Sequence, residues 1–253
     1  MIIFRYDKTF EGLLTAVFDA YVRRTFPDML LAEEDPGPLF ITEEHAVITD
    51  GEKSGRVWRA LFRKLQKEVC NMLMMAWLSE EGGVDGMLLR YMRRVFDSKG
   101  QVTTDFSDPD ILRVKQLAQK VSRERETLMQ FTRFQKGGDN TYFAPVSPRY
   151  NALPLSIPYF KDRFRDQKWL IYDIKRRYGF YYDLETVTEV TMEDDGHLLD
   201  GRLDEKLMAE DEKLFQSLWK TYFHSMAIKE RINPKLQRQH MPRRFWKYLT
   251  EKQ

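Results

Sequence analysis

The sequence predicts an α+β fold: an antiparallel sheet, made of two hairpins joined by a helix, packs against N-terminal and C-terminal helices. Two observations support this class. Residues 128–191 are the only long region with a sheet pattern, whereas residues 8–126 and 203–250 repeat apolar side chains at helical spacing. At 253 residues the chain suits one large domain, so we expect a single domain over residues 1–253.

The N-terminal part begins with a short apolar strand and continues as helices. Met1–Tyr6 suits a strand, and Asp7 or Thr9 can cap the helix that follows. Apolar residues at helical spacing predict one long helix from Ser54 to Ala76. Asp108-Pro109 is typical of a helix start, because Asp caps well and Pro suits the first turn. The sequence leaves open whether the first strand joins the central sheet.

The sheet region divides into strands, turns and one connecting helix. The strand–strand–helix–strand–strand order favours an antiparallel sheet with helices on one face. Its expected elements are a strand at Leu128–Phe134, a turn at Gln135–Asn140, a strand at Thr141–Val146, a helix around Leu153–Phe164, strands at Trp169–Ile174 and Tyr178–Tyr182, and an edge strand at Thr186–Thr191.

Composition excludes several classes of protein. The 41 basic and 39 acidic residues give a net charge of +2, so any nucleic-acid role must come from local patches. A single cysteine, Cys70, excludes an intrachain disulfide, a thiolate zinc site and an iron–sulfur cluster, and it favours the reducing cytoplasm. No apolar run reaches the roughly 20 residues of a membrane span. We expect no membrane contact.

Common catalytic motifs are absent as well. The chain has no phosphate-binding loop, no dinucleotide fingerprint, no H-E-x-x-H and no nucleophile elbow. No two of its four histidines are spaced as metal ligands. We therefore expect neither a metal nor a cofactor, and no catalytic residue is assigned.

Charge is concentrated near the C-terminus in two opposed segments. Residues 193–213 hold nine acids and three bases, whereas residues 229–253 hold eight bases and two acids. Arginine suits phosphate, and an aromatic ring can stack on an unpaired base. The alternative is that the two segments pair, or that the basic one is only a solvated surface. The candidate nucleic-acid ligands here are Arg231, Arg238, Arg243, Arg244 and Trp246.

A second basic–aromatic cluster lies at the turn of the second hairpin. It comprises Lys175, Arg176, Arg177 and Tyr178. A tight turn normally points its side chains at solvent, so we expect these charges to be exposed. Arg176, Arg177 and Tyr178 are the further nucleic-acid candidates, and the sequence leaves open whether they bind anything.

Asp173 lies in an apolar strand, where an acid needs a partner. Arg133 is the expected partner if the two strands are neighbours. Such a pair is either structural or the mark of a site. In the second case, Arg133, Trp169 and Asp173 would line a pocket.

The chain also resembles a bacterial family described as DNA metabolism proteins with a domain of unknown function. The resemblance is carried by Tyr6–Leu14, Gln130–Phe134, Tyr142–Pro145, Pro158–Phe160, Trp169–Asp173, Glu230–Pro234 and Gln239–Trp246. Genes of that family tend to lie beside a radical-SAM protein of DNA repair or modification, and some relatives are fused to a uracil-DNA glycosylase-like domain. The resemblance therefore implies a DNA partner and one of these two protein partners.

Three hypotheses follow, in this order of preference. The first is a DNA repair or DNA modification accessory protein that binds nucleic acid and works with a radical-SAM or glycosylase partner. This chain ends soon after Trp246 and lacks a three-cysteine cluster, which favours an accessory role. The second is a protein-interaction module without DNA affinity. The third is an enzyme with a small-molecule or nucleobase pocket near Arg133 and Asp173.

Overall fold

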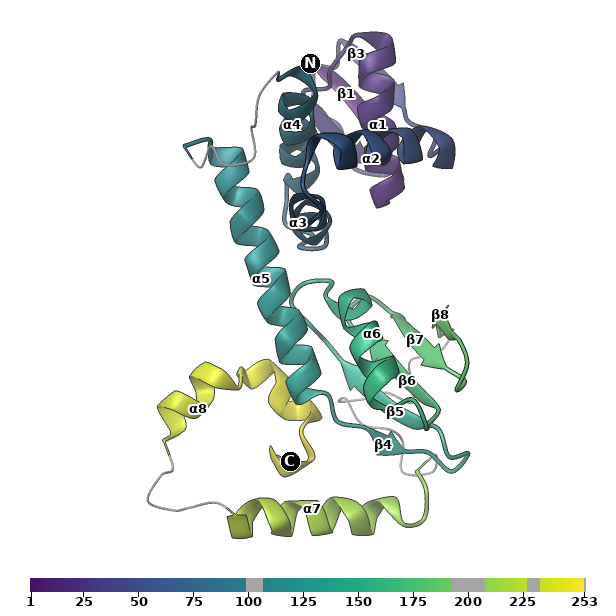
Figure 1. Ribbon diagram of the computed structural model, residues 1–253, viewed down its shortest axis with the longest axis vertical. Helices are drawn as coiled ribbons and strands as arrows, with labels where there is room; N and C mark the ends of the chain where they lie inside the picture. The colour runs from purple at the N-terminus through teal and green to yellow at the C-terminus, as the bar shows by residue number, and fades with distance from the viewer. Residues whose placement is uncertain (99–106, 193–207, 227–232, 253) are drawn as a thin grey trace. The chain divides into compact units, whose positions relative to one another are not determined.

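The fold is taken from a computed structural model that describes residues 1–98, 107–192, 208–226 and 233–252 (Figure 1). The mixed α and β structure confirms the predicted α+β class. Contacts group the chain into two compact units, Met1–Ser122 and Arg123–Gln253. The single domain over residues 1–253 stays a prediction.

The first unit contains a small parallel sheet. Strand β1 (Ile2–Tyr6) lies between β2 (Met29–Ala32) and β3 (Glu43–Ala46), and both neighbours run parallel to it. Phe4 and Tyr6 of β1 are almost fully buried. The described pairings of residues 2–6 are all with β2 and β3, so this strand belongs to a sheet of its own.

Helices of the first unit bury the apolar faces that the sequence predicts. They are α1 (Phe10–Arg23), α2 (Gly51–Lys64), α3 (Lys67–Trp77) and α4 (Val84–Asp97), followed by α5 (Pro109–Phe131). The Thr9 side chain accepts a hydrogen bond from the Gly12 amide at 2.9 Å, and Asp108 accepts from the Asp110 amide at 2.9 Å. Both predicted caps are therefore confirmed.

The single helix predicted from Ser54 to Ala76 is wrong. The chain leaves helical geometry at Leu65 and Gln66, whose backbones are extended, and it restarts as α3. Leu65 remains buried, as do Leu61 before the break and Cys70 after it. The break lets both helices bury apolar side chains in one core, which periodicity along a single axis cannot reveal.

The second unit is built on a five-stranded sheet in the order β4-β5-β6-β7-β8. The strands are β4 (Gln135–Lys136), β5 (Tyr142–Val146), β6 (Trp169–Asp173), β7 (Tyr178–Tyr182) and β8 (Val187–Val190). Neighbours are antiparallel except β5 and β6, which are parallel and joined through helix α6 (Leu153–Arg163). A helical crossover between adjacent strands makes them parallel, so two hairpins joined by a helix give a mixed sheet.

The strand predicted at residues 128–134 is wrong. Helix α5 continues to Phe131, and Thr132 donates from its amide to the Leu128 carbonyl at 3.0 Å. Leu128 is fully buried and continues the stripe of Val114, Leu117 and Val121 at helical spacing. That burial keeps the segment helical despite its aromatic residues, and only Gln135–Lys136 pairs with β5.

The C-terminal part is helical, as predicted, over the residues described. It comprises α7 (Glu212–Met226), α8 (Pro234–His240) and two 3-10 turns, η3 (Arg243–Tyr248) and η4 (Thr250–Lys252). The Asn233 side chain caps α8 by accepting from the Leu236 amide at 3.0 Å. Phe245, Tyr248 and Leu249 are buried, so they anchor this part of the chain.

Candidate nucleic-acid interface

Trp246 is the centre of the basic segment predicted to meet phosphate. It is half-buried, and its indole nitrogen donates to the Met241 carbonyl at 3.0 Å. The Arg243 guanidinium lies 5.8 Å from the centre of the indole ring, and the Lys252 ammonium lies 5.2 Å from it. Arg238 and Arg243 are both exposed. The segment thus combines exposed cations with one ring held in a fixed orientation.

Arg244 differs from its neighbours because it is already paired. Its Nη2 donates to Oε2 of Glu124, and its Nε lies 3.3 Å from Oε1 of the same carboxylate. Glu124 is buried on α5 and also accepts from the Arg149 amide at 2.7 Å. Arg244 therefore ties the C-terminal segment to the last part of α5, which belongs to the second unit from Arg123 onward.

The hairpin between β6 and β7 exposes only part of its predicted cluster. Arg177 is exposed, and its positive φ of 59° suits the turn. The prediction that Arg176 is exposed is wrong. Its Nη1 lies 2.7 Å from Oδ2 of Asp173, and its side chain is only 10% exposed. Tyr178 is half-buried and donates to Asn151 at 2.5 Å. A buried acid at the end of β6 draws Arg176 inward.

The predicted pair of Arg133 with Asp173 is also wrong. Asp173 is fully buried and is satisfied by Arg176 and by the Lys175 and Arg176 amides at 3.0 and 3.3 Å. Burial raises the pKa of the Asp173 carboxyl, although Arg176 acts to lower it. Arg133 instead donates to Glu251 at 2.9 Å. The predicted pocket therefore loses its geometric basis.

Trp169 lies at the far end of β6 from Asp173 and is a core residue. It is fully buried, with its ring 6.4 Å from that of Phe160 and 5.4 Å from that of Tyr182. Its indole nitrogen has no hydrogen-bond partner among the described residues. The three residues predicted to line one pocket thus occupy separate environments.

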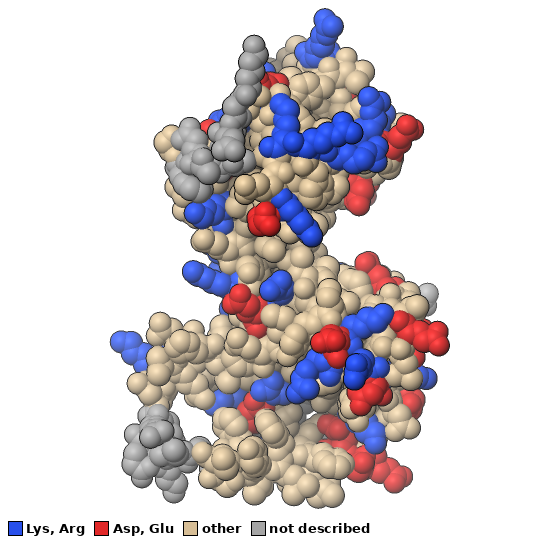
Figure 2. All heavy atoms as spheres, in the orientation of Figure 1, with Lys and Arg blue, Asp and Glu red and all other residues tan. Residues whose placement is uncertain are grey.

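Two further predictions concern residues that lie outside the described part of the chain, in whole or in part. Arg231 falls in the undescribed range 227–232, and most of the acidic segment falls in 193–207. On the face shown in Figure 2, bases and acids are interspersed over the second unit, whereas bases gather over α2 in the first. The pairing of two opposed poles stays a prediction.

Two features of the structure were not predicted. Helix α2 carries five bases and one acid, and its three arginines share one face. The i, i+3, i+7 spacing of these arginines was the signal that could have revealed them. Helix α7 exposes several large apolar side chains, which include Leu214, Phe215, Leu218, Tyr222 and Met226.

Neither a membrane span nor a metal cluster is found in the part of the chain that the structure describes. No helix there is long and apolar enough to cross a bilayer. Over the same residues, no three histidine, cysteine or acidic side chains are placed to hold a metal ion.

Comparison with known proteins shows the family. Residues 83–251 match DUF4130, a domain of unknown function, and the chain belongs to this family. No curated protein matches. Among solved structures, one similar chain is the pGpG-specific phosphodiesterase PggH from Vibrio cholerae, at 10% identity and a TM-score of 0.30, covering 89% of this chain and 98% of that one. A similarity this distant carries no argument about fold or function.

Proposed function

We propose that this protein binds nucleic acid as an accessory to DNA repair or DNA modification in the cytoplasm. The observation that carries the proposal is the exposed Arg243, whose guanidinium lies 5.8 Å from the centre of the Trp246 ring, while the indole is held by its bond to the Met241 carbonyl. A second exposed arginine, Arg238, lies on the preceding helix α8. Guanidinium groups favour phosphate, and an oriented indole offers a stacking face.

The proposal includes a protein partner. The family resemblance suggests a radical-SAM protein or a uracil-DNA glycosylase-like protein. The exposed apolar face of α7 supports such a contact, because Leu218 and Tyr222 remain 56% and 54% exposed. Contiguous apolar side chains on a surface are typical of interaction sites.

The same face of α7 favours a second candidate function, a protein-interaction module without DNA affinity. In that case Arg238 and Arg243 would be solvated surface, and α7 alone would carry function. DNA binding separates the two candidates, since only the first requires it.

The test is fluorescence anisotropy of labelled single- and double-stranded DNA across a salt series. Arg238→Ala with Arg243→Ala is compared with Arg165→Ala with Lys168→Ala, two exposed bases outside the C-terminal segment. We expect binding to weaken as salt rises. A plot of the log of the association constant against the log of salt concentration should become less steep in the first variant only, by about 1.4 for single-stranded and about 1.8 for double-stranded DNA. Arg244 is left unchanged because its replacement would remove the ion-pair partner of the buried Glu124.

Absence of binding to either DNA at low salt contradicts the proposal and favours the interaction module. Equal losses in the two variants would also contradict it, because they would reflect net charge alone.

A further inference from the structure

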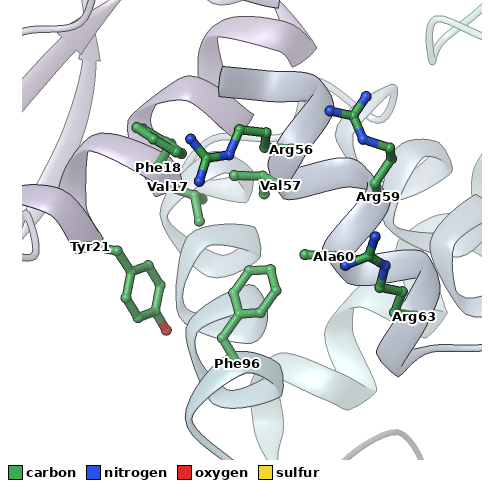
Figure 3. A pocket seen from close by; sticks show the side chains of 9 residues that line it. All are labelled: Val17, Phe18, Tyr21, Arg56, Val57, Arg59, Ala60, Arg63 and Phe96. Carbon is green, nitrogen blue, oxygen red and sulfur yellow. The ribbon is translucent and has the colours of Figure 1, made fainter. Parts of the chain in front are cut away.

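A cavity of about 540 Å³ opens in the first unit between α1, α2 and α4 (Figure 3). Cavities of this size are typical of small-molecule sites. Its walls differ in character: α1 and α4 supply aromatic rings, and α2 supplies guanidinium groups. The residues that matter here are Phe18 and Tyr21 of α1, Phe96 of α4, and Arg56, Arg59 and Arg63 of α2.

Helix geometry explains why the three arginines share the cavity. Arg56, Arg59 and Arg63 are spaced i, i+3 and i+7, so they follow one side of α2. Val57 also lines the cavity and is buried, together with Leu61 one turn later. The apolar face of α2 thus fixes its rotation, which places the basic side at the cavity mouth.

These arginines have no carboxylate partner among the described residues, and all three are exposed. The acids closest in sequence to the aromatic wall are already engaged. Asp19 accepts from Lys53 and contacts His45, both at 2.9 Å, and Asp97 accepts from Tyr21 at 2.7 Å.

Like charges on adjacent turns of a helix repel one another, at a cost in helix stability. This cost applies to Arg56 with Arg59 and to Arg59 with Arg63, since each pair shares one side of α2. A bound anion between the guanidinium groups would offset that repulsion.

The aromatic wall adds a surface for a flat ring. Phe18, Tyr21 and Phe96 are each half-buried, and the Tyr21 and Phe96 rings lie 5.8 Å apart, edge to face. The Arg56 guanidinium lies 5.1 Å from the Phe18 ring centre and turns toward it in Figure 3. Phe18 thus already accepts a planar cationic group. The cavity therefore has aromatic rings on one side and guanidinium groups, which favour phosphate, on the other.

We propose that this cavity binds a nucleotide unit, with the phosphate at Arg56, Arg59 and Arg63 and the base on the Phe18–Phe96 wall. The unit is either a free nucleotide or an unpaired nucleotide of a strand. The inference is independent of the proposed function, since it uses none of the C-terminal residues. Its lining residues, except Phe96, also precede the matched family region.

The test is isothermal titration of the full chain with AMP, adenosine, inorganic phosphate and a ten-nucleotide single strand. The cavity variant is Arg59→Gln with Arg63→Gln. The matched control is Arg24→Gln with Lys67→Gln, which removes the same charge from two exposed residues of the first unit that do not line the cavity. Thermal melting checks that both variants fold.

We expect AMP or the ten-nucleotide strand to bind, with at least a tenfold loss in the cavity variant and less than a twofold loss in the control. Adenosine and inorganic phosphate should each bind at least tenfold more weakly than AMP. If the strand binds and AMP does not, with the same variant dependence, the ligand is a nucleotide within a strand.

Three results would overturn the inference. The first is that neither AMP nor the strand binds. The second is that the cavity variant and the control lose the same amount of affinity. The third is that inorganic phosphate binds as tightly as AMP when AMP binds. Arg238→Ala with Arg243→Ala should leave AMP binding unchanged. The proposed DNA binding by the C-terminal segment and the proposed nucleotide binding in this cavity can therefore fail independently, and the two variants distinguish them.

Discussion

At the scale of single residues, buried charges in the second unit are satisfied by different partners from those predicted. Asp173 pairs with Arg176, three residues along the same hairpin. Arg133 pairs with Glu251, more than a hundred residues away. Buried acids need hydrogen-bonding partners, and the sequence shows that need without showing which base meets it.

A double-mutant cycle tests the corrected pairing. Asp173→Asn and Arg176→Gln should couple by about 0.5–3 kcal/mol, because each change removes the same ion pair between the two side chains. Asp173→Asn with Arg133→Gln should add to within about 0.5 kcal/mol. Urea unfolding of the single and double variants measures both values, and the opposite pattern would restore the Arg133 pairing.

Glu251 predicts a dependence of stability on pH. Its carboxylate is buried, which alone would raise its pKa. Hydrogen bonds from its own amide, from Trp219 at 3.0 Å and from Arg133 at 2.9 Å outweigh burial and hold the pKa below its usual value. In the window below that usual value, the unfolded chain binds more protons, so stability falls as pH falls.

We expect Glu251→Gln to lower the free energy of unfolding at pH 7 by about 1–3 kcal/mol, since it weakens two buried hydrogen bonds. The difference from wild type should shrink as pH falls below the usual glutamate pKa of about 4.3, because the unfolded wild-type chain then binds protons that the folded carboxylate resists. Urea unfolding at pH 7 and at pH 3.5 measures this difference. A difference that is constant with pH would show that Glu251 is not stabilising as an anion.

At the scale of elements, starts of helices were predictable and breaks were not. Asp7, Thr9, Asp108 and Pro109 act locally, so the sequence shows them directly. The break at Leu65 depends instead on packing against the rest of the first unit. Local signals therefore locate where a helix begins better than where it ends.

Thr9 gives the corresponding test at the start of α1. Thr9→Ala should destabilise the protein by about 1 kcal/mol, because the Gly12 amide loses its side-chain acceptor. Thr9→Ser keeps the oxygen and should cost less than about 0.5 kcal/mol. Thermal or urea unfolding compares the two, and equal losses would mean that the hydroxyl does not act as a cap.

At the scale of the whole molecule, charge and apolar surface are distributed over two units. The net charge of +2 conceals a basic side on α2 in the first unit and a basic–aromatic segment around Trp246 in the second. Helix α7 adds an exposed apolar face in the second unit. The two basic surfaces are each tested by their own variant, Arg59→Gln with Arg63→Gln in the first unit and Arg238→Ala with Arg243→Ala in the second.

The sequence by itself determined the α+β class, the β-hairpin at residues 169–182, the connecting helix and several helix starts. These rest on periodicity and capping, which act over a few residues. It also located the basic C-terminal residues as candidates, of which Arg238 and Arg243 are exposed. It missed the cavity on α2, although the spacing of its arginines was visible.

Only the tertiary structure decided the remaining points. It extended α5 through residues predicted as a strand, placed residues 2–6 in a separate sheet, and divided the buried charges into new pairs. It also joined the arginines of α2 to rings from α1 and α4. Each of these depends on which distant segments share a core or a surface, and that proximity follows from packing rather than from local pattern.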